Sequence, residues 1–84
     1  MATLRDDRGK GRLELDEAGA TSFADYRREG GRLFLDHVEA PPELRGTGAA
    51  GRLMQAIVAY AGEENLSIVP ICGYAAAWLK RNRA

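Results

Sequence analysis

The sequence is poor in cysteine and histidine and has no excess of charge of either sign. Its single cysteine, Cys72, allows no intramolecular disulfide. Twelve Lys and Arg residues balance twelve Asp and Glu residues, so the net charge at pH 7 is zero. Nucleic-acid binding normally requires a basic excess or patch, so this balance argues against a nucleic-acid partner.

The sequence also has no long hydrophobic run. No apolar stretch is long enough to cross a bilayer, and residues 1–16 have no apolar segment of the kind found in secretory signals. We therefore expect no membrane partner and a reducing, cytoplasmic location. The 84 residues suffice for one modest core, which predicts a single domain over residues 1–84, with residues 1–11 partly flexible. Asp6 and Asp7 are interpreted as solvated surface.

The first half of the chain has the pattern of short strands. Residues 12–16 alternate between polar and apolar side chains, which is the period of a half-buried strand. Turns at residues 17–19 and at Gly30–Gly31 separate further strands at residues 20–28 and 32–38. These features predict a three-stranded antiparallel meander.

The strand pattern ends at Pro41-Pro42, because proline has no N–H group to donate to a strand ladder. After these prolines the apolar residues follow a helical period. An apolar stripe then predicts an amphipathic helix over residues 48–62. The stripe consists of Leu53, Met54, Ile57, Val58 and Ala61. A short strand is expected at residues 66–71, after a helix stop at Asn65, and a second helix at residues 74–81. The fold class is thus α+β, in the order β-β-β-α-β-α, with a right-handed β-α-β crossover if its strands are parallel.

The stretch RGTGAAGR, residues 45–52, lies directly before the first predicted helix. A helix start leaves N–H groups unpaired and carries partial positive charge, and glycines let an anion approach the backbone. Pyrophosphate is a natural ligand for such a loop. The candidate N–H donors are Gly46, Thr47, Gly48, Ala49 and Ala50, with Arg45 and Arg52 adding charge at the rim.

Two common phosphate-binding loops fit this stretch poorly. Gly46–Gly51 matches G-x-G-x-x-G, but the dinucleotide-binding form needs a strand leading straight into the first glycine. Seven residues, two of them prolines, separate Val38 from Gly46, and the next strand ends at Ile71-Cys72 instead of an acid. Dinucleotide binding is therefore a remote alternative. A P-loop is excluded, because no Gly-Lys-Ser/Thr follows.

Residues 45–50 match the (Gln/Arg)-x-x-Gly-x-(Gly/Ala) motif of the GNAT acetyltransferases at Arg45, Gly48 and Ala50. Nearly the whole chain resembles the short, single-domain GNAT-like proteins of the YjdJ type. The resemblance rests on the loop and on three further stretches in the same order. These are His37-Val38-Glu39-Ala40-Pro41, Val69-Pro70-Ile71-Cys72 and Ala75-Ala76-Ala77-Trp78-Leu79-Lys80-Arg81.

The resemblance implies a minimal GNAT-like fold that binds acetyl-CoA and moves its acetyl group to an amine acceptor, a small molecule or a protein lysine. In that family the loop holds the pyrophosphate, and the strands on either side of the helix splay apart. The pantetheine arm would then bond to backbone at Val38, Glu39 and Ala40, with the thioester directed toward Cys72. The chain lacks the family's acceptor-side helices and leaving-group tyrosine. A non-catalytic acyl-CoA-binding, sensing or interaction module is therefore the alternative.

Four side chains are candidates for the chemistry. Cys72 is either a small buried residue or an acyl relay or proton donor at a helix start. His37, on a strand, shares a face with Leu33 and Leu35 and is either a partly buried histidine or the general base. Glu39 could assist as a base through water, and Tyr74 could protonate the leaving thiolate. No metal site is predicted, and the oligomeric state cannot be read from the sequence.

Overall fold

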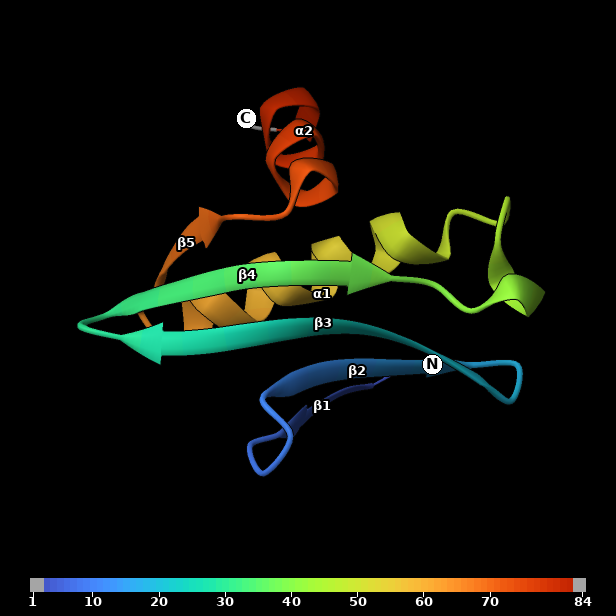
Figure 1. Cartoon of the computed structure of the whole chain (residues 1–84), viewed down its shortest axis with the longest axis horizontal. Helices are drawn as coiled ribbons and strands as arrows, with labels where there is room; N and C mark the ends of the chain where they lie inside the picture. The colour runs from blue at the N-terminus through green and yellow to red at the C-terminus, as the bar shows by residue number, and fades with distance from the viewer. Residues whose placement is uncertain (1–2, 83–84) are drawn as a thin grey trace.

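The computed structural model describes residues 3–82, which form one five-stranded sheet and two α-helices (Figure 1). The strands are β1 Leu4–Asp7, β2 Arg12–Glu17, β3 Ala20–Glu29, β4 Arg32–Glu39 and β5 Ser67–Pro70. The helices are α1 Ala49–Glu63 and α2 Gly73–Asn82, and a 3₁₀ turn, η1, covers Pro42–Leu44. Within residues 3–82, neither helix has the length and apolar character that a membrane span requires.

The sheet is mixed, with its strands in the order β1-β2-β3-β4-β5. The first four strands pair antiparallel, and β5 returns through α1 to pair parallel with β4. The α+β class is confirmed. The predicted three-stranded meander and the order β-β-β-α-β-α are wrong, because residues 4–7, expected in a partly flexible start, form an additional strand, β1, that pairs antiparallel with β2, with Leu4 packed against the core. Three charged residues follow Leu4, so this strand shows little apolar alternation.

The core lies between the sheet and α1, which lies behind β3 and β4 in Figure 1. Its fully buried large side chains are Leu13, Leu33, Leu35, Leu53, Met54 and Ile57. The predicted helical stripe is therefore confirmed except at Val58, which is 41% exposed. Val58 lies at the edge of the stripe and lines a groove between the two helices instead of facing the sheet.

A β-bulge in β4 changes which side chains face the core. Asp25 pairs with His37 and Tyr26 pairs with Leu35, so Asp36 is an extra residue in β4. Side chains alternate with period two along a strand, and one extra residue reverses the alternation beyond it. Val38 therefore faces the core, and His37 faces the other side of the sheet. The expectation that His37 shares a face with Leu33 and Leu35 is wrong for this reason.

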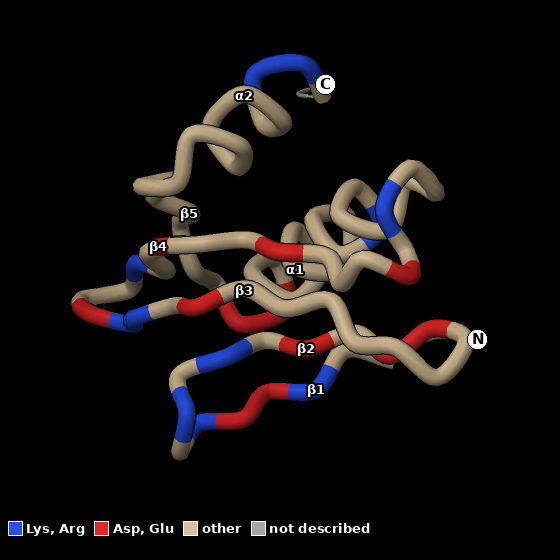
Figure 2. Tube along the Cα trace, turned by 45° about the vertical axis from the view of Figure 1, so that its right-hand side comes forward, with Lys and Arg blue, Asp and Glu red and all other residues tan. Residues whose placement is uncertain are grey.

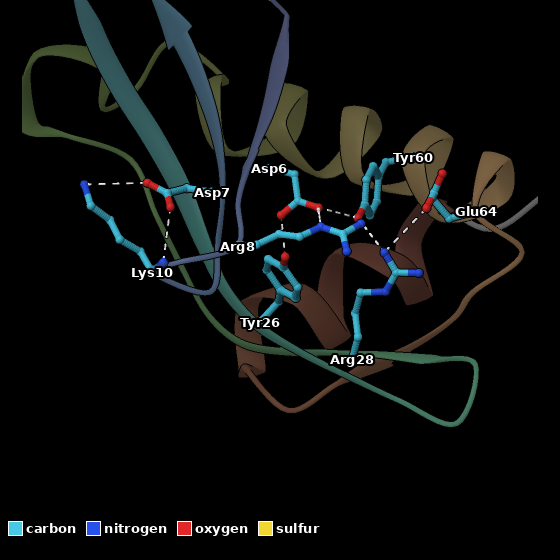
Figure 3. A network of polar contacts seen from close by, with 8 residues as sticks. All are labelled: Asp6, Asp7, Arg8, Lys10, Tyr26, Arg28, Tyr60 and Glu64. Carbon is cyan, nitrogen blue, oxygen red and sulfur yellow. Dashed lines mark hydrogen bonds and ion pairs between the residues drawn. The ribbon is translucent and has the colours of Figure 1, made fainter.

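Asp6 holds β1 against β3 and α1 (Figure 3). Its carboxylate accepts hydrogen bonds from the hydroxyls of Tyr26 and Tyr60, the latter at 2.8 Å, and pairs with Arg8 at 3.3 Å. Arg28 extends the network by donating to the Tyr60 hydroxyl at 3.1 Å. Only 19% of the Asp6 side chain is exposed, so the interpretation of Asp6 as solvated surface is wrong.

The same contacts set the protonation of the network. Partial burial alone would raise the pKa of Asp6, but the hydrogen bonds from Tyr26 and Tyr60 and the charge of Arg8 outweigh it and lower that pKa. Burial and the hydrogen bond to Asp6 raise the pKa of Tyr26 and of Tyr60. Asp6 is therefore a carboxylate, and both tyrosines are neutral donors, over the whole neutral pH range.

Candidate functional site

The parallel pairing of β4 with β5 stops halfway along β4. The ladder runs from Arg32 opposite Ser67 to Leu35 opposite Pro70. The Leu35 carbonyl then accepts hydrogen bonds from the N–H groups of Ile71 and Cys72, both at 3.0 Å. Beyond this point β4 continues to Glu39 while the chain after β5 turns into α2. The two strands therefore separate next to the bulge, and residues 36–39 are not paired with β5.

The residues on both sides of the glycine loop are buried in the fold. Leu44 before the loop and Ala49 after it are buried together with Ala20 in a small apolar cluster. Between them Gly46 has φ +81° and Gly48 has φ +84°, a left-handed conformation that glycine adopts without steric cost. The loop thus has a defined shape that depends on glycine at these two positions.

The start of α1 is free of side-chain capping. Gly48 is the N-cap residue, makes no side-chain cap hydrogen bond, and is followed by a first turn without an acidic residue. The first turn of a helix has N–H groups without intrahelical partners and carries partial positive charge. No acidic or capping side chain at this helix end offsets the partial positive charge. An uncapped helix start of this kind is what the sequence predicts for an anion site.

A pocket of about 240 Å³ opens at this loop. It is lined by Ala40, Leu44, Arg45, Gly46, Gly48, Ala49, Ala50, Gly51 and Tyr74. Arg45 is the charged member of this set, and its Nε donates to the Ala40 carbonyl at 3.4 Å. The Tyr74 hydroxyl lies 4.0 Å from where a Cβ on Gly51 would be, so this hydroxyl faces the first turn of α1. The structure therefore brings Tyr74 and Ala40 to the loop.

Arg52 is turned away from that pocket. Its Nε and Nη2 donate to the two carboxylate oxygens of Glu17, at 2.7 and 3.2 Å, and its Nη1 donates to the Thr47 carbonyl at 2.7 Å. The hydrogen bond to Glu17 raises the pKa of the Arg52 guanidinium above its ordinary value. Neither Arg52 nor Thr47 lines the pocket.

Cys72 lies where β4 and β5 part. Its N–H is bound to the Leu35 carbonyl, and its own carbonyl accepts a hydrogen bond from the Ala76 N–H at 3.0 Å. Cys72 therefore immediately precedes α2, half-buried against the main core, as a free thiol. Val38 faces that core from β4 on the other side of the opening.

His37 and Glu39 pair on the face of the sheet that α1 does not cover. Their Nε2 and Oε1 atoms are 3.0 Å apart, and their side chains are 52% and 46% exposed. The hydrogen bond with His37 lowers the pKa of Glu39, which is therefore ionised at neutral pH. This exposed imidazole–carboxylate pair is chemically able to accept a proton from an approaching ammonium group.

Residues 12–84 match a family model described as GCN5-related N-acetyl-transferase. The chain belongs to the GCN5-related N-acetyltransferase (GNAT) family. A search of curated proteins found no match. The matched range begins with β2, so β1 and its Asp6 precede the part recognised as GNAT.

The sequence alone did not reveal the roles of two residues near the glycine loop, Glu17 and Gly51. Glu17 lies 35 positions before Arg52 in the chain, and no local pattern connects the two. Gly51 belongs to the glycine-rich stretch that the sequence reveals, but its close contact with Trp78 of α2 is visible only in the tertiary structure. A Cβ on Gly51 would lie 3.3 Å from Nε1 of Trp78, so glycine at this position allows α2 to approach α1 closely.

A second groove, of about 630 Å³, lies between α1 and α2 away from the strand opening. It is lined by Gln55, Val58, Ala76, Trp78, Leu79, Lys80 and Asn82. Figure 2 shows basic residues at the end of α2 and no acidic residue along it. None of the predicted site residues lines this groove, so the smaller pocket at the glycine loop is the candidate site of this GNAT protein.

Proposed function

We propose that this GNAT protein binds acetyl-CoA and transfers its acetyl group to an amine, as one domain over residues 1–84. The proposal includes the short YjdJ type within the family and a reducing, cytoplasmic location, which suits the free thiol of Cys72. The observation that carries it is the combination of an uncapped glycine-rich helix start with a strand pair that opens beside it. The family match supplies the reaction class.

In this proposal the loop holds the pyrophosphate. The N–H groups of Gly48, Ala49 and Ala50 at the start of α1 and the side chain of Arg45 would contact it, since they line the same pocket. Gly46 and Thr47 shape the loop. The unpaired edge of β4 at residues 38–40 would bond to the pantetheine arm, as the family resemblance implies.

Two routes for the acetyl group are proposed, one with the His37–Glu39 pair as the base and one with Cys72 as an acyl carrier. In direct transfer the amine attacks the thioester carbonyl, His37 with Glu39 accepts the amine proton, and the CoA thiolate leaves and is protonated by water. The Tyr74 hydroxyl, a candidate donor from the sequence, instead faces the pocket given to the pyrophosphate, at the other end of the pantetheine arm. In a relay the Cys72 sulfur attacks the thioester, and its proton passes to the departing CoA sulfur. The amine then attacks the acetyl-cysteine, the bond between the acetyl carbon and the Cys72 sulfur breaks, and the amine proton returns to that sulfur. Only the relay leaves acetyl on the protein.

The relay predicts a covalent intermediate. Incubation with acetyl-CoA in the absence of an amine should increase the intact mass of the protein by one acetyl group. The increase should be absent in Cys72→Ala, and it should disappear from wild type when hydroxylamine is added, because a thioester is cleaved and an amide is not. Unmodified wild-type protein that still binds acetyl-CoA would leave direct transfer as the route.

The proposed ligand is tested by isothermal titration calorimetry of the wild-type protein with acetyl-CoA, CoA and NADH. We expect both CoA compounds to bind and NADH to give no heat of binding, because the chain lacks the strand-to-glycine connection of a dinucleotide fold. Folded protein that binds no CoA compound would contradict the proposed function.

A non-catalytic acyl-CoA-binding, sensing or interaction module is the alternative function. Trp78 favours this alternative. It packs on the core beside Gly51. By the family pattern it lies near the place where many members have a tyrosine that donates a proton to the leaving thiolate. Acetyl-CoA binding without CoA release across a panel of amines, including a polyamine and lysine peptides, would support this alternative.

A further inference from the structure

Arg52 connects three parts of the fold that meet behind the glycine loop. It is the fourth residue of α1, and its guanidinium binds Glu17 at the end of β2 through two parallel hydrogen bonds. The same guanidinium donates to the Thr47 carbonyl at 2.7 Å and lies 3.3 Å from the Thr47 hydroxyl oxygen. The planar, forked donor set of arginine can make all these bonds at once, whereas the single ammonium of lysine cannot.

The bond to the Thr47 carbonyl determines where the next N–H group points. The described chain has no cis peptide bonds, so the Thr47 carbonyl and the Gly48 N–H point in opposite directions across their shared peptide plane. Since Arg52 binds the carbonyl, the Gly48 N–H is directed away from Arg52. The pocket agrees with this orientation, because Gly48 and Ala49 line it while Thr47 and Arg52 do not.

The charges of Arg52 and Arg45 also distinguish the back of the loop from its pocket side. Glu17 uses both carboxylate oxygens on Arg52, and only 18% of its side chain is exposed. The positive charge of Arg52 is thereby compensated behind the loop. Arg45 is the charged side chain on the pocket side.

We propose that Arg52 is a positioning residue, held by Glu17, that orients the Gly48 N–H toward the bound pyrophosphate and does not itself contact the anion. This inference rests on the proposed function and assigns a role to a residue that the sequence pattern had placed at the phosphate rim. A direct phosphate contact by Arg52 is the competing role.

Two substitutions give opposite results for the two roles. Glu17→Gln removes the carboxylate that holds Arg52. If Arg52 positions the loop, the Kd for CoA should rise roughly tenfold, the effect of losing one well-placed hydrogen bond. If Arg52 contacts phosphate, Glu17→Gln should free its charge and lower the Kd. Arg52→Lys should likewise weaken binding in the positioning role and preserve it in the contact role, since the charge remains.

The measurement is calorimetric titration with CoA at two salt concentrations, at a temperature well below the unfolding midpoint of every variant. Glu14→Gln is the matched control, because Glu14 lies on the same strand and pairs with Arg5 away from the loop. We expect weaker binding by Glu17→Gln and Arg52→Lys with an unchanged salt dependence, and wild-type binding by Glu14→Gln.

Other outcomes separate the explanations. Unchanged CoA affinity in a folded Glu17→Gln protein with a lowered unfolding midpoint would show that the ion pair only stabilises the fold, and it would overturn the proposal. Tighter binding with a steeper salt dependence would overturn it in favour of direct contact. Wild-type protein that binds no CoA would instead overturn the proposed function, and the positioning role with it.

Discussion

Replacing Gly48 by Glu is expected to abolish CoA binding. Gly48 has φ +84°, and a Cβ there would lie 3.3 Å from Nη1 of Arg52. A side chain with Cβ costs about 1–2 kcal/mol in this backbone conformation and would displace the arginine behind the loop. The new carboxylate would start on the Arg52 side of the loop, where it competes with Glu17 for the guanidinium and adds negative charge at the helix start that binds the pyrophosphate, a like-charge repulsion of several kcal/mol at close range. Each 1.4 kcal/mol is a factor of ten, so we expect a loss of more than roughly hundredfold, measured by calorimetry.

The control separates the loss of the site from the strain of the substitution. Gly31 has φ +77° and open space around its Cβ position, and it lies in the β3–β4 turn at the far end of β4. Gly31→Glu therefore introduces the same side chain in nearly the same backbone conformation outside the pocket. It should lower stability and leave the Kd for CoA unchanged. Wild-type affinity in Gly48→Glu would show that the start of α1 does not bind CoA.

Replacing Asp6 by Asn is expected to lower the free energy of unfolding at pH 7 by about 1.5–3 kcal/mol. Hydrogen bonds to a charged group contribute about that much, and Asn keeps the shape of Asp6 without its charge. Two tyrosine hydroxyls and Arg8 bind this carboxylate, so the substitution weakens the contacts that hold β1 to β3 and α1. The total free energy of unfolding of a small domain is about 5–15 kcal/mol, so a change of this size should be clearly measurable by urea unfolding.

Asp7→Asn is the matched control, since the neighbouring Asp7 pairs with the exposed Lys10 at 3.8 Å (Figure 3). Exposed ion pairs contribute about 0–1 kcal/mol, so Asp7→Asn should change stability little. Equal effects of the two substitutions would contradict the role given to Asp6.

The loss in Asp6→Asn should depend on pH with a definite sign. The pKa of Asp6 is lower in the folded protein than its ordinary value of about 3.9 in an unfolded chain. A carboxyl group with a lowered folded pKa stabilises the fold above its unfolded pKa, and that contribution is lost as pH falls through the folded pKa. The difference between wild type and Asp6→Asn should therefore be constant from pH 7 to about pH 5 and shrink below about pH 4.

Most elements of this fold could be predicted because their signals are local. Strand alternation, the apolar stripe of α1 and the prolines after β4 each arise from neighbouring residues. Asn65 ends α1 with φ +56°, as its residue type predicts. The glycine stretch likewise indicated a helix start suited to an anion, because backbone conformation at Gly46 and Gly48 depends mainly on the absence of a Cβ.

The features that the sequence did not reveal depend on contacts between distant parts of the chain. β1 forms because Leu4 reaches the core and Asp6 reaches two tyrosines, and neither partner is visible in four mostly charged residues. His37 changes face because Asp36 bulges out of the pairing with β3, and one inserted residue reverses a period of two. Arg52 faces Glu17 because α1 packs beside the end of β2. Periodicity and residue type encode the elements and the loop, whereas register and packing decide which side of each element a side chain occupies.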